Sequence, residues 1–260
     1  MTIKAIFFDQ DGVLIDTERD GHRVAYNKAF KQEGFDFHWD LKKYSWLLSV
    51  TGGKERLRLF FETDNLFPEL TVTQVEELVS RIHERKTAIF IDLIKKKELP
   101  LRSGIKRLMQ EAMEAGLMIG ICTASDQRSA NAIATTMLAS IDFHFILAGD
   151  MVTRKKPDPE IYLRGLEKAG IAPEECLVVE DSQKGLQAAK SAGIRTIVTT
   201  NMFTEDEDLQ GADIIVSRLG EADGKKGVLK YAEYDFDFDG VVYLSNLLNY
   251  FQHTGSPHTS

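Results

Sequence analysis

Short apolar runs alternate with segments of helical periodicity over the second half of the chain, and one such run stands at its start. The first run, residues 3–8, reads IKAIFF, and three further runs, LMIGIC, FHFIL and CLVV, each precede a helical pattern. A last run, RTIVTT, follows these. Strands that alternate with helices and are apolar throughout are typical of a parallel sheet with helices on both faces. The pattern predicts an α/β fold with a doubly wound parallel sheet.

The segment between the first run and the second has helical periodicity and almost no strand-like run. Its longest amphipathic stretch follows Thr73, and Glu76 three residues later is the partner expected in a capping box. Trp46 is expected in the apolar core of this helical segment. The pattern therefore predicts three parts: a core domain (1–16 and 100–251), an inserted helical domain (17–99) and a disordered tail (252–260).

The composition argues against several classes of partner. The 260 residues carry a formal charge of −8, whereas nucleic-acid binding requires a basic surface. No apolar run approaches the ~20 residues that span a bilayer, and the start MTIKAIFF has no signal-peptide pattern. We therefore expect a cytoplasmic monomer that binds neither nucleic acid nor membrane.

Cys122 and Cys176 both lie in strand-like runs and are expected to be buried, reduced thiols.

Polar side chains follow four of the predicted strands. They are, in chain order, Asp9 and Asp11, Thr123 and Ser125, Lys156, and Glu180 and Asp181. Since the carboxyl ends of parallel strands meet at one edge of a sheet, these groups are expected to converge on one crevice. Carboxylates suit Mg²⁺, and an ammonium and a hydroxyl beside them neutralise and orient phosphate oxygens. The sequence predicts a site for Mg²⁺ and a phosphoryl group.

The two acids after the first strand can divide the chemistry between them. An ionised Asp9 can attack phosphorus and form an aspartyl-phosphate. Asp11, two residues on, can give a proton to the leaving oxygen and later remove one from water. Phosphoryl transfer depends mainly on positioning and charge neutralisation, and the residues at the strand ends supply both.

Four segments resemble the motifs of the haloacid dehalogenase (HAD) superfamily: FFDQDGVLIDTE, ICTAS, RKKPDPEIY and VVEDSQKGLQAAKSAG. The resemblance covers nearly the whole chain and implies a Rossmann-like core with an inserted helical cap. Dehalogenases and phosphonatases lack an aspartate at the position of Asp11, so the resemblance favours phosphate esters. The roles it implies are Asp9 as nucleophile, Asp11 as general acid/base, Thr123, Ala124 and Lys156 as phosphate ligands, and Asp9, the Asp11 carbonyl, Glu180 and Asp181 around Mg²⁺.

The segment WDLKKYSWLLSVTGGKERLRLFF of the expected cap resembles the CbbY proteins, phosphatases similar to those acting on xylulose 1,5-bisphosphate. Gly52 and Gly53 permit a tight backbone turn, and Lys54 and Arg56 add two cations that suit a second phosphate. The resemblance thus implies a small phosphorylated sugar as substrate. The cap residues expected around it are Glu18, His22 and Tyr44 at sugar hydroxyls, with Gly53, Lys54 and Arg56 at the second phosphate.

Three other functions fit part of the pattern. A β-phosphoglucomutase shares the core motifs and a similar cap, but Asp126 stands where a Lys–Asn pair is expected in that mutase, and an acid repels a second phosphate. A phospho-accepting receiver module has no inserted cap. A catalytically inactive HAD-like binding protein does not need the complete acidic set. Lys54 and Arg56 alone are also compatible with a solvated helix face. The favoured prediction is a Mg²⁺-dependent sugar-phosphate phosphatase.

Overall fold

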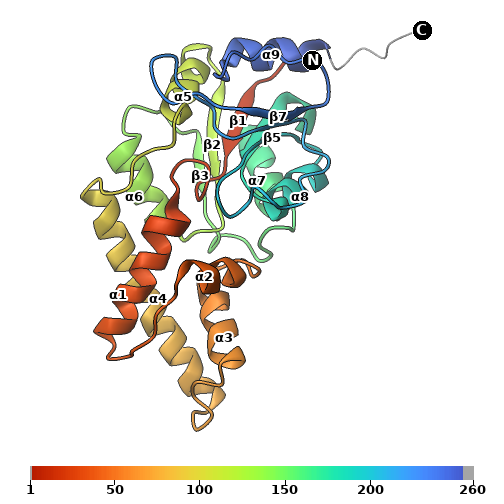
Figure 1. The fold of residues 1–260 in the computed structure, drawn as a ribbon. Coiled ribbons are helices and arrows are strands. Elements are labelled where there is room, and N and C mark those ends of the chain that lie inside the picture. Colours follow the sequence, from red (N-terminus) through yellow and green to blue (C-terminus); the bar gives the residue numbers. More distant parts are fainter. Residues whose placement is uncertain (1, 254–260) are drawn as a thin grey trace.

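A sheet of seven strands forms the centre of the computed structural model, which describes residues 2–253 (Figure 1). The strands are β1 (Ala5–Phe8), β2 (Met118–Cys122), β3 (Phe145–Leu147), β4 (Cys176–Glu180), β5 (Arg195–Thr199), β6 (Ile214–Val216) and β7 (Leu229–Ala232). They lie in the order β3-β2-β1-β4-β5-β6-β7 and pair in parallel, except that β7 runs antiparallel to β6 at one edge. The predicted doubly wound α/β fold is confirmed.

Helices cover both faces of the sheet. They are α5 (Ile105–Glu114), α6 (Gln127–Met137), α7 (Glu160–Ala169), the 3₁₀ turn η2 (Pro173–Glu175), α8 (Gln183–Ser191) and α9 (Leu244–His253). Successive residues of a strand point to opposite faces, so Ile6 and Phe8 pack with α5 and α9, whereas Ala5 and Phe7 pack with α7 and α8. All four side chains are fully buried. Burial on both faces explains why the run is apolar throughout.

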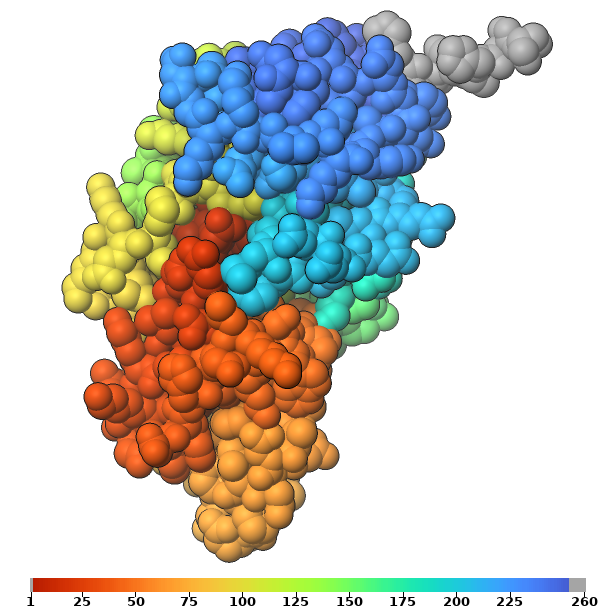
Figure 2. All heavy atoms as spheres, viewed as in Figure 1, coloured from red at the N-terminus to blue at the C-terminus, as the bar shows by residue number. Residues whose placement is uncertain are grey.

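Helices also fill the chain between β1 and α5, and we call them the inserted helices. They are the π-helical turn η1 (Glu18–His22), α1 (Arg23–Gln32), α2 (Leu41–Leu47), α3 (Gly53–Thr63) and α4 (Val72–Lys95). Because they follow β1 directly, they stand at the carboxyl ends of the parallel strands, where they form a separate lobe (Figure 1, Figure 2). Tyr26, Phe30, Trp39 and Phe60 pack ring against ring in an apolar core of their own. The domain limits of 17 and 99 stay a prediction.

The two connections between the inserted helices and the sheet lie side by side. Ile15 pairs with Leu101 as an antiparallel bridge, and the Arg102 amide donates to the Leu14 carbonyl at 2.8 Å. The Arg102 guanidinium also donates to carbonyls in the loops after β1, β5 and β6. This side chain therefore ties the returning connection to three loops at the carboxyl edge of the sheet.

The start of α4 differs from the predicted capping box. Thr71, not Thr73, precedes the helix: its hydroxyl accepts the Gln74 amide at 3.3 Å, and the Gln74 side chain accepts the Thr71 amide at 2.9 Å. The sequence TVTQVEE contains two overlapping Thr-x-x-Gln/Glu patterns, so spacing alone does not choose between them. Glu76, the predicted partner, instead accepts from Arg58 Nε at 2.6 Å.

Trp46 is not in the core of the inserted helices, against the prediction. The short helix α2 turns Tyr44 and Leu47 inward, and both are fully buried. Trp46 therefore faces away from them and is 42% exposed. Its ring lies 5.1 Å from the ammonium of Lys43.

Three further expectations concern the chain as a whole. Helix α9 continues to His253, so the predicted tail does not begin at residue 252, and its remainder, 254–260, lies outside the described residues. Cys122 and Cys176 are buried and form no disulfide, as predicted. Within residues 2–253, no helix combines the length and the apolar character that crossing a membrane requires.

Candidate active site

The loops after β1, β3 and β4 bring four charged side chains together. The Lys156 ammonium lies 2.8 Å from Asp9 Oδ1 and 2.6 Å from Glu180 Oε1, and it also donates to the Cys122 carbonyl at 2.9 Å. Asp181 follows Glu180 in the chain. Asp9, Lys156 and Asp181 are each 7% exposed, and Glu180 is not exposed at all. Groups predicted from separate strand ends thus meet at one buried point.

Three carboxylates of this cluster fit a metal ion. Oxygens of Asp9, Glu180 and Asp181 lie within 4.8 Å of one another. Burial raises the pKa of Asp9 to about 8, with the negative charges of Glu180 and Asp11 acting in the same direction against Lys156. Burial and the charges of Asp9 and Glu180 also raise the pKa of Asp181. One ammonium offsets only part of this charge, and a divalent cation with oxygen ligands, such as Mg²⁺, would offset the rest.

Asp11 lies beside this cluster but has partners of its own. Its Oδ1 accepts from Thr17 Oγ1 at 2.7 Å and lies 3.0 Å from His22 Nε2, and its Oδ2 accepts from Ser125 Oγ at 2.5 Å. Burial alone would raise the pKa of Asp11, but the charge and hydrogen bond of His22, with the two hydroxyl donors, outweigh burial and lower the pKa. Asp11 is therefore held as an anion. His22, expected at a sugar hydroxyl, lies against Asp11.

The turn after β2 is built around Thr123. This side chain is fully buried, and its hydroxyl accepts the Ser125 amide at 3.1 Å, while its own amide donates to the Leu147 carbonyl at 3.0 Å. The turn presents Ala124 and Ser125 toward the cavities described below. The structure thus shows Thr123 shaping the turn, and contact between its hydroxyl and a phosphate stays a prediction.

Three of the expected cap residues contact one another. Tyr44 donates to Glu18 Oε2, and the Arg56 guanidinium lies 3.3 Å from the Glu18 carboxylate and 3.3 Å from the Tyr44 hydroxyl. The side chains of Arg56 and Glu18 are 14% and 15% exposed. Burial, with the nearby Glu18 charge, raises the pKa of Tyr44, so this hydroxyl remains a hydrogen-bond donor. The three residues form a polar cluster at the boundary between the inserted helices and the sheet.

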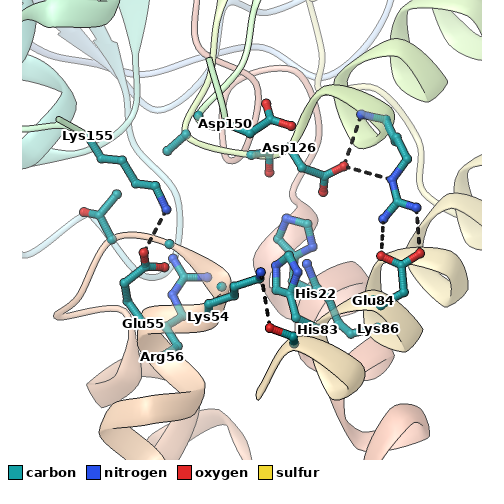
Figure 3. Close-up of a pocket in the computed structure, with 18 of the residues that line it drawn as sticks. His22, Lys54, Glu55, Arg56, His83, Glu84, Lys86, Asp126, Asp150 and Lys155 are labelled. Carbon is teal, nitrogen blue, oxygen red and sulfur yellow. Dashed lines mark hydrogen bonds and ion pairs between the residues drawn. The ribbon is translucent and has the colours of Figure 1, made fainter. Parts of the chain in front are cut away.

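Two cavities meet at this polar cluster. The first, about 490 Å³, is lined by Asp9, Asp11, Lys156 and Asp181 among others, and we call it the catalytic cavity. The second, about 630 Å³, lies between α3, α4 and α6 and is called the distal cavity. Glu18, Thr51, Arg56 and Ala124 line both. Figure 3 shows the labelled residues around the distal cavity, and His22, Gly53 and Lys54 are among its lining residues.

Gly53 has a steric reason to be glycine. A Cβ at this position would lie 2.6 Å from His83 Nε2 and 2.7 Å from the Tyr26 hydroxyl. Its carbonyl also accepts from that hydroxyl at 2.8 Å. The close approach of α3 to α4 at the distal cavity therefore depends on the missing side chain.

Two residues of the site were not found by sequence reasoning. Lys86 of α4 lines the distal cavity, is 5% exposed, and has its ammonium 5.2 Å from the Tyr26 ring and 5.3 Å from the Phe90 ring. Asn201, just after β5, donates to Asp181 Oδ2 at 2.6 Å. Both had a signal: Lys86 interrupts an apolar helical stripe, and Asn201 follows a strand end, as the other core residues do.

Comparison with known proteins places the chain in a family. Residues 3–193 match the family of haloacid dehalogenase-like hydrolases. The chain is 38% identical to the protein CbbY of Cereibacter sphaeroides, over 87% of the chain and 96% of that protein. It is 36% identical, with a TM-score of 0.75, to the crystal structure of a CbbY mutant of Rhodobacter sphaeroides in complex with xylulose-(1,5)bisphosphate, over 86% of this chain and 97% of that one.

A more distant similarity extends to a mutase. The β-phosphoglucomutase of Bacillus subtilis strain 168 is 27% identical, over 84% of this chain and 91% of that protein. The family match covers most of the chain, and the chain spans 96% of the CbbY protein of Cereibacter sphaeroides. The chain therefore belongs to the haloacid dehalogenase-like hydrolase family, and it is an enzyme related to the CbbY proteins, as its motifs predict.

Proposed function

We propose that the protein is a Mg²⁺-dependent phosphatase of a small phosphorylated sugar, with xylulose 1,5-bisphosphate as the leading candidate. The observation that carries the proposal is the buried cluster of Asp9, Lys156, Glu180 and Asp181, with Asp11 beside it at the catalytic cavity. The hydrolase family supports the reaction class. The CbbY structure with xylulose bisphosphate supports the substrate class.

In the first half of the reaction, an Asp9 oxygen attacks phosphorus and the ester bond breaks. The leaving sugar oxygen takes a proton from Asp11 and departs as an alcohol. Lys156, 2.8 Å from Asp9, orients the nucleophile and lies where it can neutralise a phosphoryl oxygen. Bound by Asp9, Glu180, Asp181 and the Asp11 carbonyl, Mg²⁺ would supply the positive charge that the phosphoryl oxygens need.

In the second half, Asp11 removes a proton from water, which attacks the phosphorus of the aspartyl-phosphate. The bond to Asp9 breaks, inorganic phosphate leaves, and the Asp9 carboxylate is restored. Because its partners lower the pKa of Asp11, the proton donated in the first half needs a second holder. His22 Nε2, 3.0 Å from Asp11, is placed to share it. In this proposal His22 is a proton partner of Asp11.

The inserted helices serve as a cap that recognises the rest of the substrate. Lys54, Arg56 and Lys86 come from two different helices and line one side of the distal cavity. Three cations are suited to a second phosphate. Glu18 and Tyr44, which contact Arg56, can turn to sugar hydroxyls once a phosphate binds Arg56.

A phosphosugar mutase of the β-phosphoglucomutase type is the second candidate, supported by the shared family. Asp126 lines the distal cavity and caps α6 by accepting the amides of Arg128 and Ser129. A mutase has to hold a second phosphate while the sugar reorients, and an acid on that wall opposes it. The same acid would face the second phosphate of a bisphosphate substrate, so the products formed, and not Asp126, separate the two candidates.

The substrate is tested by phosphate release with Mg²⁺ from xylulose 1,5-bisphosphate, ribulose 1,5-bisphosphate, fructose 1,6-bisphosphate and β-glucose 1-phosphate. The proposal predicts the highest kcat/KM for xylulose 1,5-bisphosphate. Equally slow release from all four would contradict the substrate assignment and leave a phosphatase of another sugar phosphate. Glucose 6-phosphate formed from β-glucose 1-phosphate would favour the mutase.

The change Arg56→Ala is expected to lower kcat/KM selectively for bisphosphate substrates. Loss of a charge-assisted contact to the second phosphate should lower kcat/KM for a bisphosphate by about 10- to 100-fold. A monophosphate ester lacks that group and should be affected much less. Arg58→Ala is the matched control, because Arg58 lies on the same helix but pairs with Glu76. An equal loss on both substrates would count against a second-phosphate site at Arg56.

Because of Lys86, the affinity for a bisphosphate is expected to fall at alkaline pH. Burial lowers the pKa of Lys86 to about 8, although the charges of Asp11 and Glu18 oppose this. The ammonium is present below that pH and is lost as the pH rises through it, so KM for a bisphosphate should increase above about pH 8. Lys86→Met should have a high KM throughout and lack this increase. An unchanged pH profile in Lys86→Met would refute the assignment.

A further inference from the structure

Two ion pairs join the inserted helices to the sheet domain on opposite sides of the distal cavity (Figure 3). On one side, Lys155 Nζ lies 3.0 Å from Glu55 Oε1 of α3. On the other, Arg128 of α6 makes two parallel hydrogen bonds to Glu84 of α4, at 2.7 and 2.8 Å. Lys54 and Lys86 lie between the two pairs in the same view. Each pair thus crosses the boundary between the inserted helices and the sheet domain at the distal cavity.

The positions of these four residues link them to the site. Lys155 directly precedes Lys156, and Glu55 directly precedes Arg56. The first pair therefore connects the loop that carries Lys156, the partner of Asp9, to the helix that carries the proposed second-phosphate ligand. Gly52 makes room for it, since a Cβ there would lie 2.1 Å from Glu55 Oε2 and 2.7 Å from Lys155 Nζ.

We propose that the Glu55–Lys155 and Glu84–Arg128 pairs hold the inserted helices closed over the substrate, and that these four are positioning residues for turnover of phosphorylated sugars. The inference rests on the proposed function. The pairs break to admit the substrate and form again around it, which brings Arg56 and Lys156 to the separation that a bisphosphate needs.

The strength of the pairs suits a closure that has to reverse in every cycle. The Glu55 and Lys155 side chains are 39% and 31% exposed, and those of Glu84 and Arg128 are 64% and 54% exposed. Pairs this accessible to water are weak and screened by salt. Breaking one should shift the ratio of closed to open forms by roughly two- to fivefold, and a second break should add to the first.

The alternative for Lys155 is direct binding of substrate, and single substitutions separate the two roles. If the pair closes the cavity, Glu55→Gln and Lys155→Met each lower kcat/KM for xylulose 1,5-bisphosphate by about two- to fivefold. The exchanged variant Glu55→Lys/Lys155→Glu recovers most of the loss. If Lys155 binds phosphate, Glu55→Gln raises kcat/KM, Lys155→Met lowers it, and the exchange gives no recovery, which would overturn the proposal. Glu84→Gln and Arg128→Met test the second pair in the same way.

Two comparisons exclude a general loss of structure. With p-nitrophenyl phosphate, an ester too small to need the distal cavity, the same variants should keep wild-type kcat/KM. Asp64→Asn is the matched control: Asp64 pairs with Lys43 at 2.6 Å with side chains 34% and 29% exposed, but both partners lie in the segment between β1 and α5. Asp64→Asn should leave kcat/KM unchanged for both substrates. Equal losses on both esters, or a loss in Asp64→Asn as large as in Glu55→Gln, would contradict closure by the ion pairs.

Closure by the ion pairs can be tested without substrate, and therefore independently of the proposed activity. Small-angle X-ray scattering of the substrate-free chain should give a larger radius of gyration for Lys155→Met/Arg128→Met than for the wild type, and a wild-type value for the variant with both pairs exchanged. Identical values for all three would refute the closure even in an active phosphatase. If the wild type hydrolysed neither ester, the proposed function would fail, and the scattering would still decide whether the pairs hold the two parts together.

Discussion

Asp9→Asn is expected to abolish turnover while leaving the fold intact. An amide of the same shape cannot form the aspartyl-phosphate, so kcat should fall on the order of 10⁴-fold or more. The substitution removes one of three buried carboxylates that lie within 4.8 Å of one another, so it relieves repulsion at the site. Thermal unfolding should therefore show a melting temperature no lower than that of the wild type. Phosphate release and unfolding are measured on the same preparation.

The control for Asp9→Asn is Asp20→Asn, which changes an exposed carboxylate whose partner is the neighbouring Arg19. It should retain full activity. Product binding gives a further check, because Asp9→Asn should still bind inorganic phosphate through Lys156. Substantial phosphate release by pure Asp9→Asn would contradict the assignment of Asp9 as nucleophile.

Asp11→Asn is expected to separate the two halves of the reaction. An asparagine keeps the shape of the side chain but cannot exchange a proton, and loss of general acid–base catalysis costs about 10²- to 10⁴-fold. A substrate with a good leaving group, such as p-nitrophenyl phosphate, needs little help from an acid, so Asp9 should still become phosphorylated. Hydrolysis of the aspartyl-phosphate needs a base to activate water and should be slow.

Mass spectrometry of acid-quenched protein checks this expectation directly. Asp11→Asn should carry one added phosphoryl group on the peptide that contains Asp9, and the wild type should show much less. The double variant Asp9→Asn/Asp11→Asn is the control and should show none. Wild-type turnover by Asp11→Asn, or a phosphoryl group located on another peptide, would refute the proposed roles.

The sheet and the core of the site could be predicted because one physical rule covers both. Strands buried on two faces have to be apolar, so they stand out as runs of apolar residues in the sequence. Parallel pairing brings the carboxyl ends of these strands to one edge of the sheet. Asp9, Lys156 and Glu180 could therefore be placed together from their positions after such runs. The edge strand β7 gave no such signal, since it is only partly buried.

Contacts between distant parts of the chain could not be predicted from local patterns. The capping box was assigned to the wrong threonine because Glu76 pairs with Arg58 of another helix. Lys155 directly precedes Lys156 in the sequence, yet it pairs with Glu55, which is 100 residues away in the sequence. The contact of His22 with Asp11 depends on the π-helical turn η1, while its contact with a sugar hydroxyl stays a prediction. Each depends on how the inserted helices pack on the sheet.

Hydrolysis of a sugar phosphate by this site with Mg²⁺ can be followed in a single reaction by phosphorus NMR. Xylulose 1,5-bisphosphate is incubated with the purified protein in the presence of Mg²⁺, and separately with a chelator in its place. One inorganic phosphate is expected for each bisphosphate consumed, only with Mg²⁺, together with a sugar monophosphate. A bisphosphate that remains intact with Mg²⁺, or conversion to an isomeric sugar phosphate without inorganic phosphate, would contradict the proposed hydrolysis.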